Sequence, residues 1–308
     1  MTNRNDGNER NQIVPIAPSS LTKQGSSNLV RRGLNDLSKL AGSDANAETW
    51  IKKGQDLYQR GRYEEAIACF DRVLELFPEV IDAAFQKGLA LWALVRFEEA
   101  LVCFDGVVEM DPDNSPAWAN KGSILDELHR PDDSLQCYRR ALELSPDNGW
   151  IWYGQARVLH LQGRLDDAMR SYDKTLELDA GHFQAWANKG IALHRQGRYL
   201  DALACSDKAT DLKPTYAVAW SDKSAILLSL DRFSEALACS ERACVLDANL
   251  ADAWYFRASA EERLGREGDA VNSFQRFLGL APRDPEWQAK IEEAHRRLQK
   301  LRTGDTVL

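Results

Sequence analysis

The spacing of tryptophan constrains this chain more than any other feature of its sequence. Six of the nine tryptophans lie 34 residues, or a multiple of 34, apart, and Ala84 fills the one missing place. These tryptophans are Trp50, Trp118, Trp152, Trp186, Trp220 and Trp254. A fixed period of this length predicts a tandem array of one small unit, in which each unit buries its apolar face against the next.

Other residue types follow the same period. When each unit is numbered from three residues before the tryptophan, a small residue stands at place 8, another at place 20, and an aromatic residue or serine at place 24. The resulting seven units are 47–80, 81–114, 115–148, 149–182, 183–216, 217–250 and 251–284. No insertion or deletion interrupts them, so all seven units are predicted to share one structure.

Each unit is predicted to form two helices. Apolar residues at helical spacing, such as Trp186, Gly190 and Leu193, indicate the first helix. Its end is marked in four units by glycine, the residue that best adopts a left-handed conformation after a helix. Proline ends the second helix in five units, and Asn114 before Pro116 predicts a capped helix start.

The small residues of the unit have a steric role. Gly or Ala at place 8 is predicted to let the second helix approach closely, while aromatic side chains at places 4 and 24 fill the gaps between helices. Serine replaces a packing residue at four positions, which predicts looser packing in the third, fifth and sixth units. These positions are Ser134, Ser206, Ser224 and Ser240.

The pattern W-x-x-K-G-x-x-L…G-R-Y-x-x-A-x-x-x-S/F…P resembles the tetratricopeptide repeat family over residues 47–284. The resemblance implies an all-α fold, a right-handed superhelical α-solenoid of seven tandem 34-residue helix-turn-helix repeats. Such an array needs a terminal helix with a polar outer face. Residues 285–302 are predicted to be this capping helix, because Trp287, Ile291, Ala294 and Leu298 form an apolar stripe opposite charged residues.

The flanking segments lack the repeat. Residues 1–27 are rich in Asn, Ser and Gln and are predicted to be a disordered tail. Residues 28–46 are interpreted as an amphipathic helix and linker, either a cap on the first repeat or a segment that docks elsewhere, and 303–308 as a short tail. Membrane-surface binding by the helix is a weaker alternative, because its three basic residues attract weakly.

Composition excludes several classes of function. The net charge of −8 opposes non-specific binding to nucleic acid or to an anionic membrane. The N-terminus lacks the apolar core of a signal peptide, and no apolar run is long enough to span a membrane. Nucleotide-binding, metalloprotease and serine-hydrolase signatures are also missing, so a catalytic role and a cofactor are not expected.

Five of the six cysteines share place 23 of the repeat. Equivalent residues of neighbouring repeats are separated by about 10–20 Å, judged from helix dimensions, which is too far for a disulfide or a shared metal ion. Small-residue packing is therefore predicted for Cys69, Cys103, Cys137, Cys205 and Cys239, with Cys244 beside them. Unpaired thiols in this number favour a reducing compartment, hence the cytoplasm.

In the family that this chain resembles, the first helices line a concave groove that holds a peptide or a partner helix. Places 2, 5, 6, 9, 12 and 13 would face that groove. Mapped onto units two to five, the candidate partner-binding residues are Phe85, Leu89, Trp92, Asn120, Trp150, Tyr153, Arg157, His160, Asn188, His194 and Arg195.

Two features distinguish this candidate groove. Trp92, Trp150 and Tyr153 lie outside the packing stripe and are expected to be exposed, as aromatic anchors of an interface are. Arg157, His160, His194 and Arg195 are expected to form a basic cluster suited to an acidic or C-terminal carboxylate segment.

The sequence therefore predicts a non-catalytic protein-binding scaffold or adaptor. The alternative is an assembly or regulatory subunit that contacts a larger complex through its convex face or its N-terminal helix. The oligomeric state does not follow from the sequence.

Overall fold

The structure, a computed structural model, describes residues 47–303. The interpretations of residues 1–27 as a disordered tail, of 28–46 as a helix and linker, and of 303–308 as a tail lie outside the described residues, except that Thr303 is the last residue of a helix. Helices account for all of the regular structure in this part of the chain, which contains no strand. None of its helices is long and apolar enough to cross a membrane.

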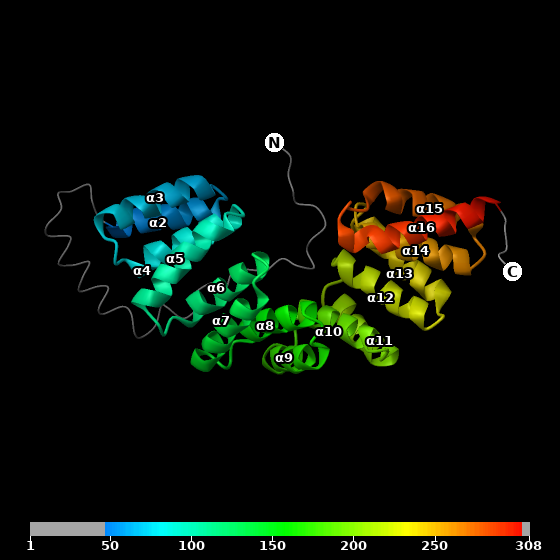
Figure 1. Ribbon diagram of the computed structural model, residues 1–308, viewed down its shortest axis with the longest axis horizontal. Coiled ribbons are helices and arrows are strands. Elements are labelled where there is room, and N and C mark those ends of the chain that lie inside the picture. Colours follow the sequence, from blue (N-terminus) through cyan, green and yellow to red (C-terminus); the bar gives the residue numbers. More distant parts are fainter. Residues whose placement is uncertain (1–46, 304–308) are drawn as a thin grey trace. The chain divides into compact units, whose positions relative to one another are not determined.

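The helices α2 to α15 follow one another in antiparallel pairs, one pair to each 34-residue unit of the sequence (Figure 1). The first helices are α2 (Ala47–Gln59), α4 (Ile81–Ala93), α6 (Ser115–Glu127), α8 (Gly149–Leu161), α10 (Phe183–Arg195), α12 (Ala217–Ser229) and α14 (Ala251–Arg263). The second helices are α3 (Tyr63–Leu76), α5 (Phe97–Met110), α7 (Pro131–Leu144), α9 (Leu165–Leu178), α11 (Tyr199–Leu212), α13 (Phe233–Leu246) and α15 (Glu267–Leu280). A last helix, α16 (Pro285–Thr303), follows them, so the predicted all-α repeat architecture is confirmed.

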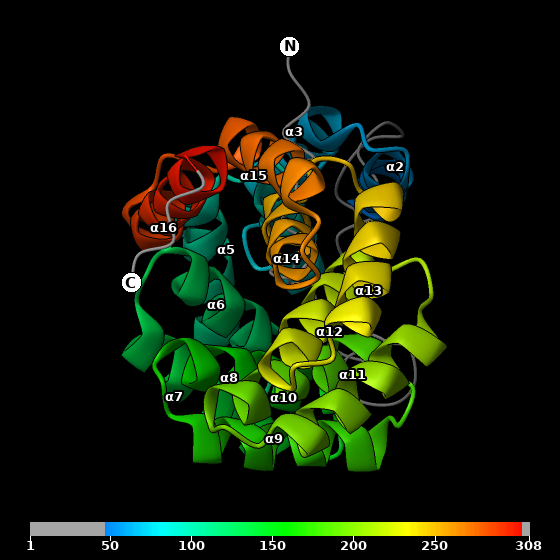
Figure 2. The ribbon, with the colours of Figure 1, turned by 90° about the vertical axis from the view of Figure 1, so that its right-hand side faces the viewer.

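The chain divides into two compact units, and the division falls inside α9. The described part of the N-terminal unit is residues 47–167, and that of the C-terminal unit is residues 168–303. Consecutive helices pack on one another from α2 to α8 in the N-terminal unit and from α10 to α16 in the C-terminal unit, as α12 to α15 illustrate (Figure 2). Each unit is described by itself below.

The small residue at place 8 brings the two helices of a pair together. A Cβ atom on Gly54 would lie 2.6 Å from the ring of Phe70, and one on Gly88 would lie 2.9 Å from the ring of Phe104. Both distances are shorter than carbon atoms tolerate, so glycine is required for this approach. The steric role predicted for place 8 is confirmed.

The turn between the two helices of a pair needs a left-handed residue. Gly61, Gly163, Gly197 and Gly265 have φ values of 73° to 75°, as the sequence predicts. The same place is taken by Val95, His129 and Asp231 with φ of 61°, 56° and 57° in the other three repeats. Valine is the exceptional member, because a β-branched side chain is strained in this region.

Two of the four serines at packing places form hydrogen bonds between the helices of their pair. All four are at most 1% exposed. Ser134 Oγ donates a hydrogen bond to the carbonyl of Gly122 (2.7 Å), and Ser224 Oγ donates one to the carbonyl of Ala236 (2.8 Å). Hydrogen bonds between the helices thus replace apolar contact at these two positions, and the expectation of looser packing there is wrong.

The tryptophan at place 4 joins the third to seventh repeats each to the preceding one. The indole N–H of Trp220 donates to the carbonyl of Pro214 at 3.0 Å. Lys223 Nζ lies 5.2 Å from the centre of the Trp220 ring and 2.8 Å from a carboxylate oxygen of Asp207, on the second helix of the preceding repeat. The same indole bond is made by Trp118, Trp152, Trp186 and Trp254.

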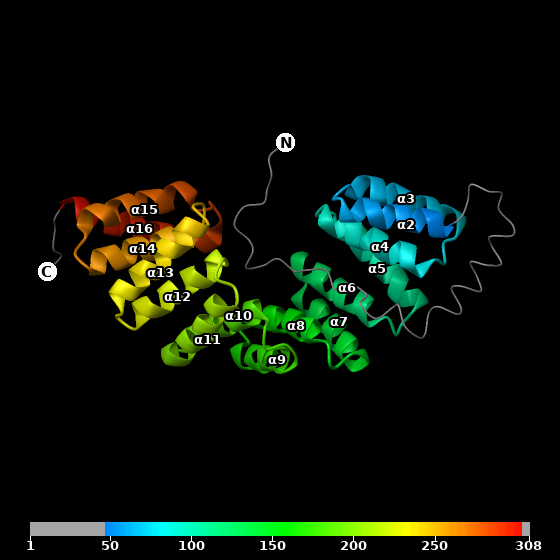
Figure 3. The same cartoon turned by 180° about the vertical axis from the view of Figure 1, so that it is seen from behind.

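Helix α16 covers the last repeat. Its residues Ala294 and Leu298 are buried in one apolar cluster with Tyr255 of α14 and Phe274 and Phe277 of α15. Viewed from behind, α16 lies against this pair (Figure 3). The capping helix predicted at 285–302 therefore agrees with the structure to within one residue at each end.

The place-23 cysteines pack between helices as predicted. Cys69, Cys137, Cys205 and Cys239 are buried, Cys103 is partly buried, and all are free thiols. Burial raises the pKa of the Cys103 and Cys137 thiols to about 11. These thiols are protonated at neutral pH, so their environment is that of packing residues rather than of nucleophiles.

Candidate functional site

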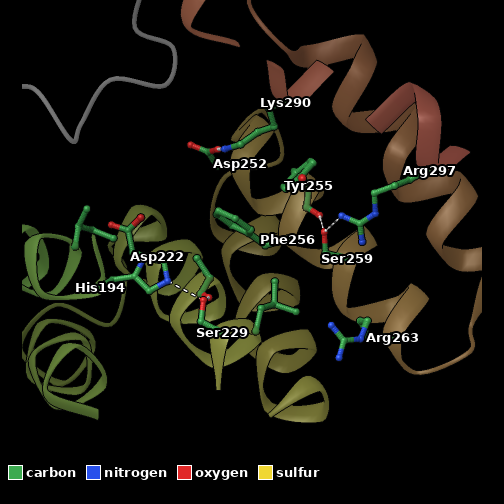
Figure 4. Close-up of a pocket in the computed structure, with 13 residues that line it drawn as sticks. His194, Asp222, Ser229, Asp252, Tyr255, Phe256, Ser259, Arg263, Lys290 and Arg297 are labelled. Carbon is green, nitrogen blue, oxygen red and sulfur yellow. Dashed lines mark hydrogen bonds and ion pairs between the residues drawn. The ribbon is translucent and has the colours of Figure 1, made fainter. Parts of the chain in front are cut away.

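A pocket of about 410 Å³ opens on the first-helix face of the C-terminal unit (Figure 4). Its wall is built from α10, α12 and α14, at the places predicted to face a groove, and from α16. The lining residues are Ile191, His194, Asp222, Ala225, Leu228, Ser229, Asp252, Tyr255, Phe256, Ser259, Arg263, Lys290 and Arg297.

Two adjacent aromatic rings on α14 form the apolar part of the pocket. Tyr255 and Phe256 pack edge to face, with ring centres 5.7 Å apart. Lys290 of α16 lies 5.1 Å from the centre of each ring, and its ammonium group also pairs with the carboxylate of Asp252. An ammonium group over aromatic faces is attracted by their electron-rich surfaces, so α16 holds a positive charge directly above an apolar surface.

Arg297 of α16 provides a second positive charge. Its guanidinium donates to Ser259 Oγ at 2.9 Å and to the carboxylate of Glu262 at 2.7 Å, and it lies 4.8 Å from the centre of the Phe274 ring. Burial, followed by the hydrogen bond to Glu293, raises the pKa of Tyr255 to about 12. Tyr255 therefore remains a neutral hydrogen-bonding phenol throughout the physiological range.

The opposite side of the pocket is polar. His194 Nε2 and Ser229 Oγ form a hydrogen bond of 2.8 Å. Burial and, secondarily, the charge of Arg195 lower the pKa of His194, so its imidazole is neutral at pH 7. Arg263 lies at the rim, 3.1 Å from Asp231, and both members of this ion pair are mostly exposed.

Several candidate residues of the N-terminal unit are buried. Phe85, Leu89 and Trp92 belong to the apolar core of this unit, and Trp92 is only 8% exposed. The rings of Phe85 and Phe104 meet edge to face at 5.3 Å. The expectation that Trp92 is exposed is therefore wrong, because it is buried in an apolar cluster that draws side chains from the neighbouring repeats as well as its own.

The polar candidates of this unit are also more enclosed than expected. Asn120 is buried, and its amide donates to the carbonyl of Pro116 at 2.9 Å. Tyr153 and His160 are buried as well, so the exposure expected for Tyr153 is wrong. Trp150, by contrast, is 41% exposed as predicted, and its ring meets that of Tyr153 edge to face at 6.3 Å.

Arg157 forms an ion pair with a carboxylate of its own unit. Its guanidinium lies 3.7 Å from Asp126, and the Arg157 residue is only 5% exposed. Burial raises the pKa of Asp126, and the charge of Arg157 opposes this shift. The buried guanidinium already neutralises an internal charge, so the expectation that Arg157 belongs to an accessible basic cluster is wrong.

The remaining candidates lie on α10 in the C-terminal unit. His194 lines the pocket, Arg195 is exposed, and Asn188 is partly buried. Among the eleven sequence candidates, only His194 lines this pocket.

Sequence reasoning missed most of the pocket. Tyr255, Phe256 and Arg263 occupy places 5, 6 and 13 of the last repeat, so the same groove rule applied there would have found them. Lys290 and Arg297 belong to α16, which lies outside the repeat array, and no periodic signal points to them.

Family comparison agrees with this architecture. Two family models, each describing the tetratricopeptide repeat, match the sequence, the first over 51–115, 119–182 and 162–217 and the second over 224–298. The chain therefore belongs to the tetratricopeptide repeat family. Its repeats form a protein-interaction scaffold in the general sense of that family. The comparison with curated proteins found no significant match.

Solved structures share the fold at low sequence identity. A tetratricopeptide repeat protein from Parabacteroides merdae matches with a TM-score of 0.64 and 15% identity over 83% of this chain and 98% of that chain. The PilW type IV pilus biogenesis factor matches with a TM-score of 0.62 and 21% identity, over 69% of this chain and 98% of its own.

A chain of the Cut9–Hcn1 hetero-tetramer of the APC/C also matches. Its TM-score is 0.64 and its identity 16%, and the match covers 91% of this chain but 60% of that one. At these identities the likeness concerns the fold alone.

Proposed function

We propose that this chain is a non-catalytic adaptor that binds a peptide segment of another protein on the first-helix face of its C-terminal unit. The observation that carries the proposal is the pocket, which combines the Tyr255–Phe256 surface with the positively charged side chains of Arg263, Lys290 and Arg297. Aromatic side chains in a concave site are the usual anchors of a peptide interface. The proposed location is the cytoplasm, which suits six free thiols.

The proposed segment carries an apolar side chain next to a carboxylate, either acidic or C-terminal. The apolar group would cover the two rings, and the carboxylate would approach Arg263 at the rim. Arg263 pairs with Asp231 in an exposed ion pair, and such a pair contributes about 0.2–1 kcal/mol. A partner carboxylate could therefore replace Asp231 at small cost.

The exposed candidates outside the pocket remain part of the proposal. Trp150 and Arg195 offer accessible side chains on the first-helix faces of their own units, and Asn188 offers a partly buried amide. A longer peptide bound at the pocket would contact Asn188 and Arg195, which lie on α10 with His194.

The proposal is tested by selecting peptides from a displayed random library on the full chain. Selected peptides are then titrated against wild type and against Phe256→Ala with Arg263→Ala. We expect the double variant to bind at least about tenfold more weakly, the equivalent of 1.4 kcal/mol. The matched control is Arg72→Ala with Val102→Ala, which removes a cation and an exposed apolar side chain from second helices of the N-terminal unit. Selected peptides that bind the pocket variant as tightly as wild type would contradict the proposal.

The alternative role, assembly into a larger complex through the outer face or the N-terminal helix, is a separate proposal. The N-terminal helix lies outside the described residues. The outer face of the second helices lies within the described residues.

A further inference from the structure

The second helices expose one regular stripe of side chains on the face turned away from the first helices. Places 18, 22, 26 and 29 of each repeat lie on this stripe, and their spacing follows the helical period. In α3, α5, α7, α11, α13 and α15 these residues are exposed, except Gly106 and Arg140, which are partly exposed. We call the stripes of α3, α5 and α7 the N-terminal outer face, and those of α11, α13 and α15 the C-terminal outer face.

The N-terminal outer face is acidic. Each of its three helices has a carboxylate at place 18 and another at place 29, against two arginines in all. The carboxylates are Glu64, Glu75, Glu98, Glu109, Asp132 and Glu143. Both arginines are paired within their helices, Arg72 with Glu75 at 3.0 Å and Arg140 with Glu143 at 3.1 Å. The face therefore has a net charge of −4.

The C-terminal outer face has only one carboxylate at the same places. Place 18 is Leu200, Ser234 and Gly268, and only Asp211 remains acidic at place 29. The basic residue at place 26 is retained throughout as Lys208, Arg242 and Arg276. The face therefore has a net charge of +2 within a chain of net charge −8.

These three basic side chains also differ in their partners. None of Lys208, Arg242 and Arg276 makes an ion pair with another residue of the described range 47–303, although Arg276 lies 6.0 Å from the centre of the Trp254 ring. In α3 and α7 a glutamate at place 29 pairs with the basic residue at place 26. In α13 and α15 place 29 is Val245 and Gly279, which cannot form this pair. Val245 is 76% exposed, more than any other large apolar side chain of residues 47–303.

We infer that the C-terminal outer face is an interaction surface, and that its occupant is the N-terminal outer face of a second copy of this chain. The two faces carry opposite net charge. The carboxylates at places 18 and 29 of one copy would therefore attract the basic side chains at place 26 of the other. Leu200 and Val245 on one face and Val102 on the other would be buried in the contact. This surface is distinct from the pocket, and the inference does not depend on the proposed peptide binding.

The contact joins two different surfaces of the same chain, which makes it heterologous. Either a closed assembly or a longer chain of copies follows from such a contact. Because its charges are exposed, the association is expected to weaken as salt screens them over a Debye length of about 10 Å at 0.1 M. Self-association that depends on both concentration and salt is the observable consequence.

Sedimentation analysis of the full chain over a range of protein concentrations tests the inference. At about 50 mM salt the average mass is expected to rise above the 34.7 kDa monomer, and at about 500 mM salt to return toward it. The decisive variant is Val245→Glu with Gly279→Glu. It restores the acidic residue that other repeats carry at place 29 and supplies Arg242 and Arg276 with partners, so folding is preserved while association is expected to be lost.

The matched control is Arg283→Ala with Arg296→Ala, which changes the net charge equally at exposed positions outside both faces. This control is expected to associate like wild type. A second variant, Glu109→Lys with Glu143→Lys, removes charge from the opposing face and should also abolish association. A wild type that stays monomeric at low salt and high concentration would overturn the inference. Loss of association in the control, or its retention in either face variant, would overturn it as well.

Discussion

Glu261 occupies a place that leucine fills in the other six repeats. The equivalent residues are Leu57, Leu91, Leu125, Leu159, Leu193 and Leu227. Glu261 is 2% exposed, and one of its carboxylate oxygens accepts from Arg257 at 2.8 Å. Its other oxygen has no hydrogen-bond partner within residues 47–303. A buried polar atom left in this state reduces stability.

The substitution Glu261→Leu is expected to raise the free energy of unfolding by about 1 kcal/mol, because it removes a buried charge and restores apolar packing. Arg257 would remain over the Trp254 ring, at 5.3 Å, and within 4.0 Å of Glu241. The urea midpoint measures the effect. The control is the reverse change at the equivalent place of the preceding repeat, Leu227→Glu, which should lower the urea midpoint strongly. A lower midpoint for Glu261→Leu would contradict the proposed cost of burying this carboxylate.

Val95 is a second residue that departs from its repeat. Its φ of 61° suits glycine, yet the residue is valine, and it is 68% exposed. A left-handed backbone costs an L-residue about 1–2 kcal/mol, and part of this is offset because glycine gains more freedom in the unfolded chain.

Val95→Gly is therefore expected to stabilise the N-terminal unit by about 0.5–1 kcal/mol. The reverse substitution at the equivalent position of another repeat, Gly163→Val, places a valine in a left-handed turn and should destabilise the protein. Thermal unfolding of both variants measures the pair, and equal shifts in one direction would exclude backbone strain as the cause.

At the scale of elements, neighbouring repeats are joined by a recurring ion pair. A basic residue at place 7 meets a carboxylate at place 25 of the preceding repeat, as in Lys121–Asp105 at 2.7 Å. The others are Lys87–Asp71, Lys189–Asp173, Lys223–Asp207 and Arg257–Glu241. Between α7 and α8 the corresponding residues are Arg139 and Gln155, which do not form such a pair.

Installing the pair there, as Arg139→Asp with Gln155→Lys, should stabilise the N-terminal unit by up to about 1 kcal/mol, the value of a partly exposed ion pair. The two single variants provide the control, because neither completes the pair. A double-mutant cycle on urea midpoints gives the coupling energy, and a coupling of zero would show that the pair does not join the repeats.

Elements were easier to predict from the sequence than the site. The helix pairs, the glycines at place 15 and the tight contact of Gly54 with Phe70 follow from local geometry that repeats every 34 residues. The exposure of a candidate side chain depends instead on the size and charge of the side chains that surround it. Trp92 is buried in an apolar cluster, and Arg157 pairs with Asp126. The residues that surround them are not among those that recur every 34 residues.

At the scale of the whole molecule, one repeat design carries two kinds of surface. The first-helix face of the C-terminal unit has the pocket with Tyr255, Phe256 and the α16 cations. The second-helix faces carry opposite charges in the two units. Conserving the packing places while varying the exposed ones lets a single architecture present separate sites.

Peptide binding at the pocket should depend on salt because cations supply part of it. Between about 50 mM and about 500 mM salt the affinity of a selected acidic peptide is expected to fall severalfold. Fluorescence anisotropy measures the titration. A neutral peptide of the same apolar sequence is the control, and an equal response of the two peptides would show that Lys290, Arg297 and Arg263 do not contribute.

Hydrogen exchange of the full chain with and without a selected peptide tests the central claim most directly. We expect slower exchange on peptide binding in α10, α12, α14 and α16, whose residues line the pocket, with exchange in α3, α5 and α7 unchanged. Protection confined to the N-terminal unit, or to the second helices, would contradict it and would place peptide binding elsewhere on the molecule.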